Sequence, residues 1–364
     1  MATYDLDRTE LNHLLTPNID PSIRTAILDY VFNGVTPASH VAIEDDHGNS
    51  PGSESGDDTQ KSHGKAGSVA DDQASHVTVK KVEVQVGDAH HLDKDAVVLD
   101  LTSANNTVTT DSALKVIVEN VATNSHLVVD GTHSVFIATG DGNDRVTLSD
   151  SGNDIVMTGK GNDWVHAGAG HDSVYAGAGN DTMFAGTGSH QLLEGGAGKD
   201  VMHGGSGAYD SIIGGTGADY IVAGTGAHQL LVGGDGSDTM YGGDGAYDSI
   251  LGGPGNDIIH AGDGAHQLVM GGAGNDQIWA GDGGDILKGG AGNDVFHINI
   301  DAHEGSDTVD GGSGHNVIDF DMHGTIDVKS MHAEHGVTVI TFTDGQTITA
   351  SHVQDLVFTE HKGP

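Results

Sequence analysis

The stretch GAHQLLVGGDGSDTMYGGDGAYDSI, from Gly226 to Ile250, contains three glycine turns built on one template. The template is G-x-G-x-D-x-U-x, where U is an apolar residue. One further residue precedes this template in each nine-residue repeat, so the D of the template is the sixth position of the repeat. The sixth position lies two places after the second turn glycine. This residue is His228 in the first turn, Asp238 in the second and Tyr247 in the third. Short turns that recur at a fixed period predict a solenoid, and the change at one position predicts that its turns are of two kinds.

The template recurs from Thr139 to His297 with a period that alternates between nine and ten residues. A two-sided roll places every second half-turn on the same edge. On one edge, which we call the regular edge, the sixth position is always aspartate: Asp144, Asp163, Asp181, Asp200, Asp219, Asp238, Asp257, Asp276 and Asp294.

The opposite edge, which we call the second edge, loses the template in its middle. Wherever His or Tyr appears there, one extra residue precedes the next Gly-Gly, and HQLLEGG, HQLLVGG and HQLVMGG recur every 38 residues. The variation is therefore a longer repeat of two coils. We assign to its sixth position Asp154, Asp172, His190, Tyr209, His228, Tyr247, His266 and Asp285.

Composition agrees with a thin, repetitive fold. The 364 residues include 58 Gly and no Cys, and only 4% are aromatic, so neither a wide core nor disulfides can stabilise the chain. The 53 acidic and 14 basic residues give a formal charge of −39, which argues against nucleic acid or anionic lipid as partners. Bound cations are the natural compensation for this charge.

The nonapeptides GGPGNDIIH, GGAGNDQIW and GGAGNDVFH, which begin at Gly252, Gly271 and Gly289, resemble the calcium-binding repeat of the RTX (repeats-in-toxin, hemolysin-type) family. The resemblance implies an all-β fold, a right-handed parallel β-roll in which loop carbonyls and aspartates of successive coils bind Ca²⁺. It also implies type I secretion and folding outside the cell. The family includes enzymes, toxins, adhesins and surface-layer proteins, so the repeat leaves the activity open.

The physical chemistry of Ca²⁺ agrees with this resemblance. Ca²⁺ takes six to eight oxygen ligands, and stacked aspartates about 4.8 Å apart repel one another without cations. Nine rungs leave eight gaps, so we expect about eight ions on the regular edge, with further sites at Asp154 with Asp172 and starting from Asp285 with Asp307. The turns need glycine for positive φ and close backbone approach, at Gly142, Gly161, Gly179, Gly198, Gly217, Gly236, Gly255, Gly274 and Gly292.

The histidines of the second edge cannot form one transition-metal site. His190, His228 and His266 would be about 9.6 Å apart on rungs two coils apart, whereas a metal needs ligands about 2 Å away. With Tyr209 and Tyr247 between them, we interpret the series as a stacked, calcium-free structural edge. A partner-contact role is the alternative.

Strand alternation separates an inner and an outer face. The inner face predicts an aliphatic core of Val146, Val156, Val165, Val174, Met183, Met202, Ile221, Met240, Ile259, Ile278, Leu287 and Phe296. The outer face carries both tryptophans, and we expect its side chains to contact a partner or the chain's own N-terminal arm: Trp164, Phe184, Tyr220, Tyr241 and Trp279. The same partner-contact role is expected of Ile23, Ile27 and Tyr30 in that arm.

Five regions are predicted along the chain. Asp20, Pro21 and Asn33-Gly34 delimit an amphipathic helix, preceded by a weaker one near 8–15. The regions are a helical arm at 1–36, an acidic Gly/Ser/His-rich linker at 37–76, solenoid coils without calcium at 77–138, the repeat array at 139–297, and a C-terminal β cap with a type I secretion signal at 298–364.

No catalytic constellation is found in the sequence. The motif around Ser50 lies in the linker without the strand and helix of a nucleophile elbow, and the segment at His303 lacks the second His of a zinc protease helix. Neither a cleaved signal peptide nor an apolar membrane span is expected.

The sequence therefore predicts a secreted, calcium-stabilised structural protein that assembles into an extracellular polymer such as a fibre, surface layer or biofilm matrix. We expect a homo-oligomer or polymer formed through the N-terminal arm. The alternative is an adhesin or carbohydrate-binding module that uses the face from Trp164 to Trp279, with a cell-surface polysaccharide as its ligand. An RTX enzyme or toxin fragment comes third.

Overall fold

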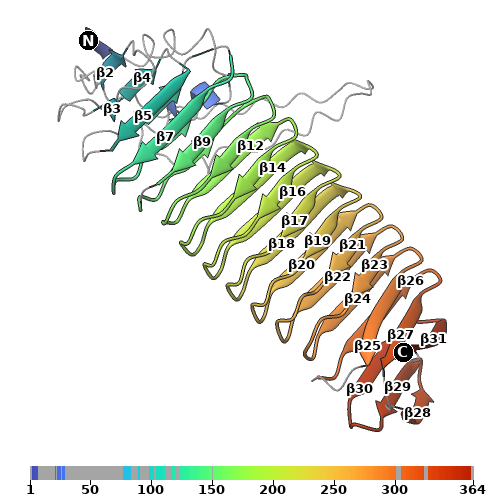
Figure 1. Ribbon diagram of the computed structural model, residues 1–364. Coiled ribbons are helices and arrows are strands. Elements are labelled where there is room, and N and C mark those ends of the chain that lie inside the picture. The colour runs from blue at the N-terminus through green and yellow to red at the C-terminus, as the bar shows by residue number, and fades with distance from the viewer. Residues whose placement is uncertain are drawn as a thin grey trace, which may run out of the picture.

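The structure is a computed structural model (Figure 1). It describes residues 2–6, 21, 23–25, 27–28, 77–82, 89–90, 98–101, 104–110, 116–119, 121, 123–149, 151–300, 305–323 and 327–361. The predicted linker at 37–76 and the weaker helix near 8–15 lie outside the described residues, as do Tyr30, Ser50 and His303.

The fold is an all-β parallel solenoid of about 11 turns, as predicted. Each coil contributes one strand to each of two facing sheets, and the coils follow one another along the axis of the roll (Figure 1). The first sheet contains β1 (Ala2–Leu6), β2 (Val77–Val82), β4 (Val98–Leu101), β6 (Val116–Glu119), β8 (Phe136–Ala138), β10 (Ile155–Met157), β12 (Ser173–Ala178), β14 (Leu192–Gly198), β16 (Ser211–Gly217), β18 (Leu230–Gly236), β20 (Ser249–Pro254), β22 (Leu268–Ala273), β24 (Ile286–Ala291), β26 (Thr308–Ser313), β28 (Val328–Glu334), β29 (Val337–Phe342) and β30 (Thr347–Ser351).

The second sheet runs along the opposite side of the roll. It contains β3 (Ala89–His90), β5 (Asn105–Thr109), β7 (His126–Asp130), β9 (Arg145–Leu148), β11 (Trp164–His166), β13 (Thr182–Phe184), β15 (Val201–His203), β17 (Tyr220–Val222), β19 (Thr239–Tyr241), β21 (Ile258–His260), β23 (Gln277–Trp279), β25 (Val295–Ile300), β27 (Val317–His323) and β31 (Asp355–His361).

The coils are stacked in register. Met202 of β15 pairs with Met183 of β13 on one side and with Ile221 of β17 on the other. Equivalent residues of neighbouring coils therefore lie one strand spacing apart, about 4.8 Å. This register places each position of the repeat in a column that runs along the roll.

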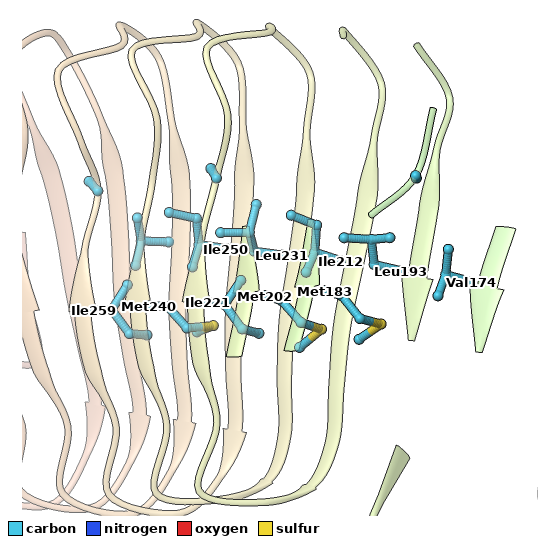
Figure 2. Packing of buried hydrophobic residues seen from close by; sticks show 14 of the residues in the cluster. Val174, Met183, Leu193, Met202, Ile212, Ile221, Leu231, Met240, Ile250 and Ile259 are labelled. Carbon is cyan, nitrogen blue, oxygen red and sulfur yellow. The ribbon is translucent and has the colours of Figure 1, made fainter. Parts of the chain in front are cut away.

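The core is a double column of aliphatic side chains between the sheets. Figure 2 shows Val174, Leu193, Ile212, Leu231 and Ile250 of the first sheet facing Met183, Met202, Ile221, Met240 and Ile259 of the second. All twelve residues predicted for the core are fully buried. The prediction missed Leu193, Ile212, Leu231, Ile250 and Val269, which are also buried.

The C-terminal end closes the roll with a small meander. β29 pairs antiparallel with both β28 and β30, and β30 pairs in parallel with β26. β31 pairs in parallel with β27. Within the described part of the chain, β31 has no strand on its other side, and its Val357 and Phe358 are exposed.

The N-terminal arm differs from its prediction in two ways. Residues 2–6 form β1, which pairs antiparallel with β2, so the arm is not wholly helical. Residues 21, 23–25 and 27–28 are helical, but Ile23 and Ile27 are already buried within the monomer. The Ile23 side chain lies beside Gly159, where a Cβ would be 3.6 Å from Ile23 Cδ1. This apolar face therefore packs on the chain's own roll, which corrects the expectation that it contacts a partner.

Candidate functional site

The aspartates of the regular edge form one continuous hydrogen-bonded column. The Oδ1 of each aspartate accepts the backbone N–H of the aspartate one coil earlier, from Asp144 N–H donating to Asp163 through Asp276 N–H donating to Asp294, at 2.7–3.0 Å. All nine aspartates are at most 3% exposed. The column is thus fixed by the backbone register of the coils.

The second carboxylate oxygen has no such partner. In Asp181 and the six rungs after it, Oδ2 is buried and accepts no hydrogen bond in the described part of the chain. A buried carboxylate oxygen without a donor is costly unless a cation is bound to it. The orphaned oxygens therefore fit Ca²⁺, which prefers carboxylate and carbonyl oxygens.

From Asp200 onward, each nonapeptide of the regular edge opens with a glycine that lies against this oxygen. A Cβ added to Gly195 would overlap Oδ2 of Asp200, and the same holds for Gly214 with Asp219 and for Gly233 with Asp238. A side chain at these three positions would fill the recess that holds Oδ2.

Burial also changes the acidity of these groups. It raises the pKa of Asp163, Asp200 and Asp257 to about 7, although backbone N–H groups donating to them act in the opposite direction. Neighbouring carboxylates on the same edge raise the pKa further. An ionised column is therefore unfavourable unless positive charge compensates it.

The second glycine of the turn has positive φ, as expected. This φ lies between 130° and 157° in eight of the nine predicted positions, from Gly161 to Gly292, whereas Gly142 lies outside that region. A Cβ on Gly217 would overlap the carbonyl oxygen of Gly198 in the preceding coil. The loop backbones are therefore too close for any side chain, and their carbonyls lie near the edge, where they can complete an oxygen shell.

The carboxylates alone do not make a compact metal site. Among the described residues, no three or more His, Asp or Glu side chains converge. Successive aspartates belong to different coils, so a Ca²⁺ ion between two coils would take carboxylates from both and the remaining ligands from loop carbonyls.

The regular edge ends in neutral residues on both sides. The N–H of Ser125 donates to Asp144 at 2.8 Å, so Ser125 occupies the rung before the first aspartate. After Asp294 the rung is Asn316, whose Oδ1 accepts the Asp294 N–H at 2.9 Å and whose Nδ2 donates to the His352 carbonyl at 3.1 Å.

The assignment of the second edge requires a correction. The N–H of Gln191 donates to Oδ1 of Asp210, and Gln229 donates likewise to Asp248, at 2.9 and 2.7 Å. The buried sixth position of this edge is therefore held by Asp154, Asp172, Gln191, Asp210, Gln229, Asp248, Gln267, Asp285 and Asp307.

The histidines and tyrosines assigned there are instead the extra residues of the longer half-turns. His190, Tyr209, His228, Tyr247 and His266 all have φ between 60° and 64°, the left-handed region that non-glycine residues rarely adopt. Tyr209 and Tyr247 are more than half exposed. The sequence could have revealed this, because counting back four residues from the next Gly-Gly selects Gln or Asp in these half-turns.

The rings of these extra residues stack along the edge, as predicted. Together with His171 they form a continuous series in which neighbouring ring centroids are 4.9–5.3 Å apart. Stacking of this kind offsets part of the cost of the left-handed backbone.

A second aromatic row lies on the outer face of the second sheet. Its centroid separations range from 4.3 to 6.4 Å, and the Arg145 guanidinium covers Trp164 at 3.6 Å. The ring order is Trp164, Phe184, His203, Tyr220, Tyr241, His260, Trp279 and His297.

The row shields its own apolar surface. Trp279 stacks between His260 and His297 at 4.4 and 4.3 Å, so a sugar ring could reach the faces of Trp279 only by displacing them. The predicted partner contacts of this row thus contact one another in the monomer. Among the described residues, no helix is long and apolar enough to cross a membrane.

Comparison with known families identifies the repeat. The model of the RTX calcium-binding nonapeptide repeat matches residues 148–183, 186–209, 194–227, 232–265, 267–296 and 299–321. No curated protein sequence matches the chain. The matched segments include the regular edge from Asp163 to Asp294 and most of the second edge.

Proposed function

Residues 148–321 of this chain belong to the RTX calcium-binding repeat family, and from this premise we propose that the protein is a calcium-stabilised structural rod of the cell exterior. RTX repeats are typical of secreted bacterial proteins, which supports an extracellular site after type I export. RTX repeat segments are also typically non-catalytic, which supports a structural role rather than an enzymatic one.

The observation that carries the proposal is the column of buried aspartates with an unpaired Oδ2. These oxygens need cations at neutral pH, and a chain with a formal charge of −39 has few of its own to offer. Nine rungs leave eight gaps, so about eight Ca²⁺ ions on the regular edge would supply sixteen positive charges. In this proposal the bound ions, rather than disulfides or a wide core, stabilise the fold.

A substitution that removes one charge and little else tests this proposal. Asp238→Asn retains an oxygen for the N–H of Asp219 but removes the carboxylate, so the variant should bind one or two fewer Ca²⁺ ions in native mass spectrometry. Asp244→Asn is the matched control, because Asp244 is exposed on a loop of the other edge. His228→Ala should also leave the ion count unchanged. Equal ion loss in Asp238→Asn and either control would refute the proposed calcium edge.

We further propose that the rods assemble into an extracellular polymer. Support comes from β31, the last strand of its sheet among the described residues, whose Val357 and Phe358 are exposed. An unpaired strand edge is a template for pairing with another chain. Because the helical residues of the arm pack on their own roll, the end of the roll is the better-supported contact.

Light scattering and electron microscopy with millimolar calcium test assembly. The full-length protein should form larger particles as its concentration rises. Val357→Lys, which leaves the stacking of Phe358 on Phe320 in place, should remain monomeric while keeping its far-UV circular dichroism spectrum. A full-length protein that stays monomeric at high concentration would rule out the polymer while leaving the calcium-stabilised rod intact.

A further inference from the structure

The glutamines of the second edge place their side chains unlike the aspartates. The Oε1 of Gln191 accepts the N–H of Gly186 in its own loop at 2.8 Å. Its Nε2 donates to the carbonyls of Gly168 and Gly170 in the loop of the preceding coil, at 3.3 and 3.2 Å. The amide thus bridges the gap between two successive loops, the position that a Ca²⁺ ion would take on the regular edge.

The arrangement repeats two coils later at Gln229. Gln267 shares the Nε2 contacts, but its Oε1 accepts no hydrogen bond among the described residues. Gln229 Oε1 accepts the Gly224 N–H at 2.9 Å, and its Nε2 donates to the Gly207 carbonyl of the preceding loop at 3.1 Å. Gln267 Nε2 donates to the Gly264 carbonyl at 3.0 Å and reaches the Gly243 carbonyl of the preceding loop at 3.5 Å. All three side chains are about 1% exposed. Because they are buried inside the edge, these amides are held in one conformation, unlike side chains on the surface.

We propose that the side-chain amides of Gln191, Gln229 and Gln267 take the place of Ca²⁺ in three alternate gaps of the second edge. The inference rests on the proposed calcium binding of the regular edge. An amide N–H satisfies carbonyl oxygens that would otherwise require a cation, and it adds no charge. The middle of the second edge is thereby held without calcium across the Gln191, Gln229 and Gln267 gaps, while the regular edge depends on the ion.

The aspartate half-turn between Gln229 and Gln267 also differs from the regular edge. On the regular edge the opening glycine faces an aspartate Oδ2, as Gly233 faces Asp238. On the second edge a Cβ added to Gly242, which opens the Asp248 half-turn, would overlap the Ala261 carbonyl instead. The carboxylate recess of the regular edge is therefore not repeated at this loop.

The isosteric substitution Gln229→Glu tests the inference. It replaces a donor with an acceptor that faces the Gly207 carbonyl, so the gap becomes an all-oxygen site. We expect Gln229→Glu to bind one more Ca²⁺ ion than the wild type, and the triple Gln→Glu variant to bind three more, by native mass spectrometry with calcium in excess. The calcium concentration needed to reach half of the folded signal should rise as well. The control is Gln277→Glu on the exposed face of β23, which adds the same charge and should bind no extra ion.

A second variant keeps the test decisive if the Glu variants do not fold. Gln229→Ala should bind at least as many Ca²⁺ ions as the wild type, because its amide holds no ion. Loss of an ion in Gln229→Ala, or Glu variants that fold with the wild-type ion count, would overturn the inference. In either of these outcomes the wild type still binds calcium, so only the inference about the glutamines fails. Failure of the proposed function would instead appear as a wild type that binds no calcium.

Discussion

At the scale of single residues, a comparison of three side chains at equivalent rungs shows which atoms the fold requires and which atoms are left for an ion. Ser125, Asp294 and Asn316 all occupy the sixth position of the regular edge, and Asp294 and Asn316 both accept a neighbouring N–H through Oδ1. Asn316 also uses its second atom, because Nδ2 donates to the His352 carbonyl. What aspartate adds is therefore a charged oxygen without a donor, placed where a cation must supply the missing partner.

Glycine substitutions should show how closely the loops approach. Gly217→Ala combines a left-handed φ of 145° with overlap between the new Cβ and the Gly198 carbonyl. The φ alone should cost about 1–3 kcal/mol, and the overlap should add to that cost. Gly336→Ala is the matched control, since Gly336 also has positive φ but no heavy atom within 4 Å of the added Cβ.

Denaturant unfolding with saturating calcium measures both variants. We expect Gly217→Ala to lose clearly more stability than Gly336→Ala. Similar losses of stability in the two variants would mean that the loops at Gly217 and Gly198 are not in such close contact.

At the scale of one half-turn, the extra residue decides which side chains face the core. His228 lies in the left-handed region and shifts the register of the strand that follows it. Leu231 is consequently buried at 0% exposure, whereas Leu230 is 36% exposed. Had His228 held the sixth position, Leu230 would face inward.

Alanine substitutions at these two neighbours test the register. Leu231→Ala should lower the free energy of unfolding by about 2–5 kcal/mol, because it leaves a cavity between the sheets. Leu230→Ala should cost well under half as much. If Leu230→Ala proved the more damaging in thermal unfolding, the register of the long half-turns would be wrong.

The sequence was sufficient for the features that repeat strictly and insufficient for those that depend on an insertion. The period, the nine aspartates of the regular edge and the twelve core positions follow from a constant spacing, and the structure agrees. The glutamine rungs were missed because the template was counted forward from the glycines, across the extra residue. The stacking of the outer aromatic row was missed because the spacing between coils was applied to the two edges and not to the outer face of the second sheet.

At the scale of the whole molecule, charge and burial oppose each other. The roll buries its carboxylates in two columns within a chain of formal charge −39. Burial raises the pKa of Asp163, Asp200 and Asp257 from an ordinary 3.8 to about 7. A raised acid pKa means that the folded state binds protons more tightly than the unfolded state does.

The metal-free protein should therefore be most stable in acid. The stability that these carboxyl groups contribute is fully present below about pH 4, near their unfolded-state pKa. It is lost as pH rises through about 7, their folded-state pKa. Calcium should reverse this trend, since it competes with protons for the same oxygens and binds better as pH rises. Thermal unfolding across this pH range in metal-free and calcium-containing buffers measures both trends. A metal-free protein with the same melting temperature throughout would contradict the raised pKa values.

The central claim is that cations between the aspartate rungs hold the roll together, and a calcium titration followed by far-UV circular dichroism tests it most directly. At neutral pH the chelated protein should show little strand signal, and calcium should restore it cooperatively. Magnesium at equal concentration should not, because it demands a tighter octahedral shell than these loops provide. A chelated protein that kept its full strand spectrum and its melting temperature at neutral pH would contradict the account.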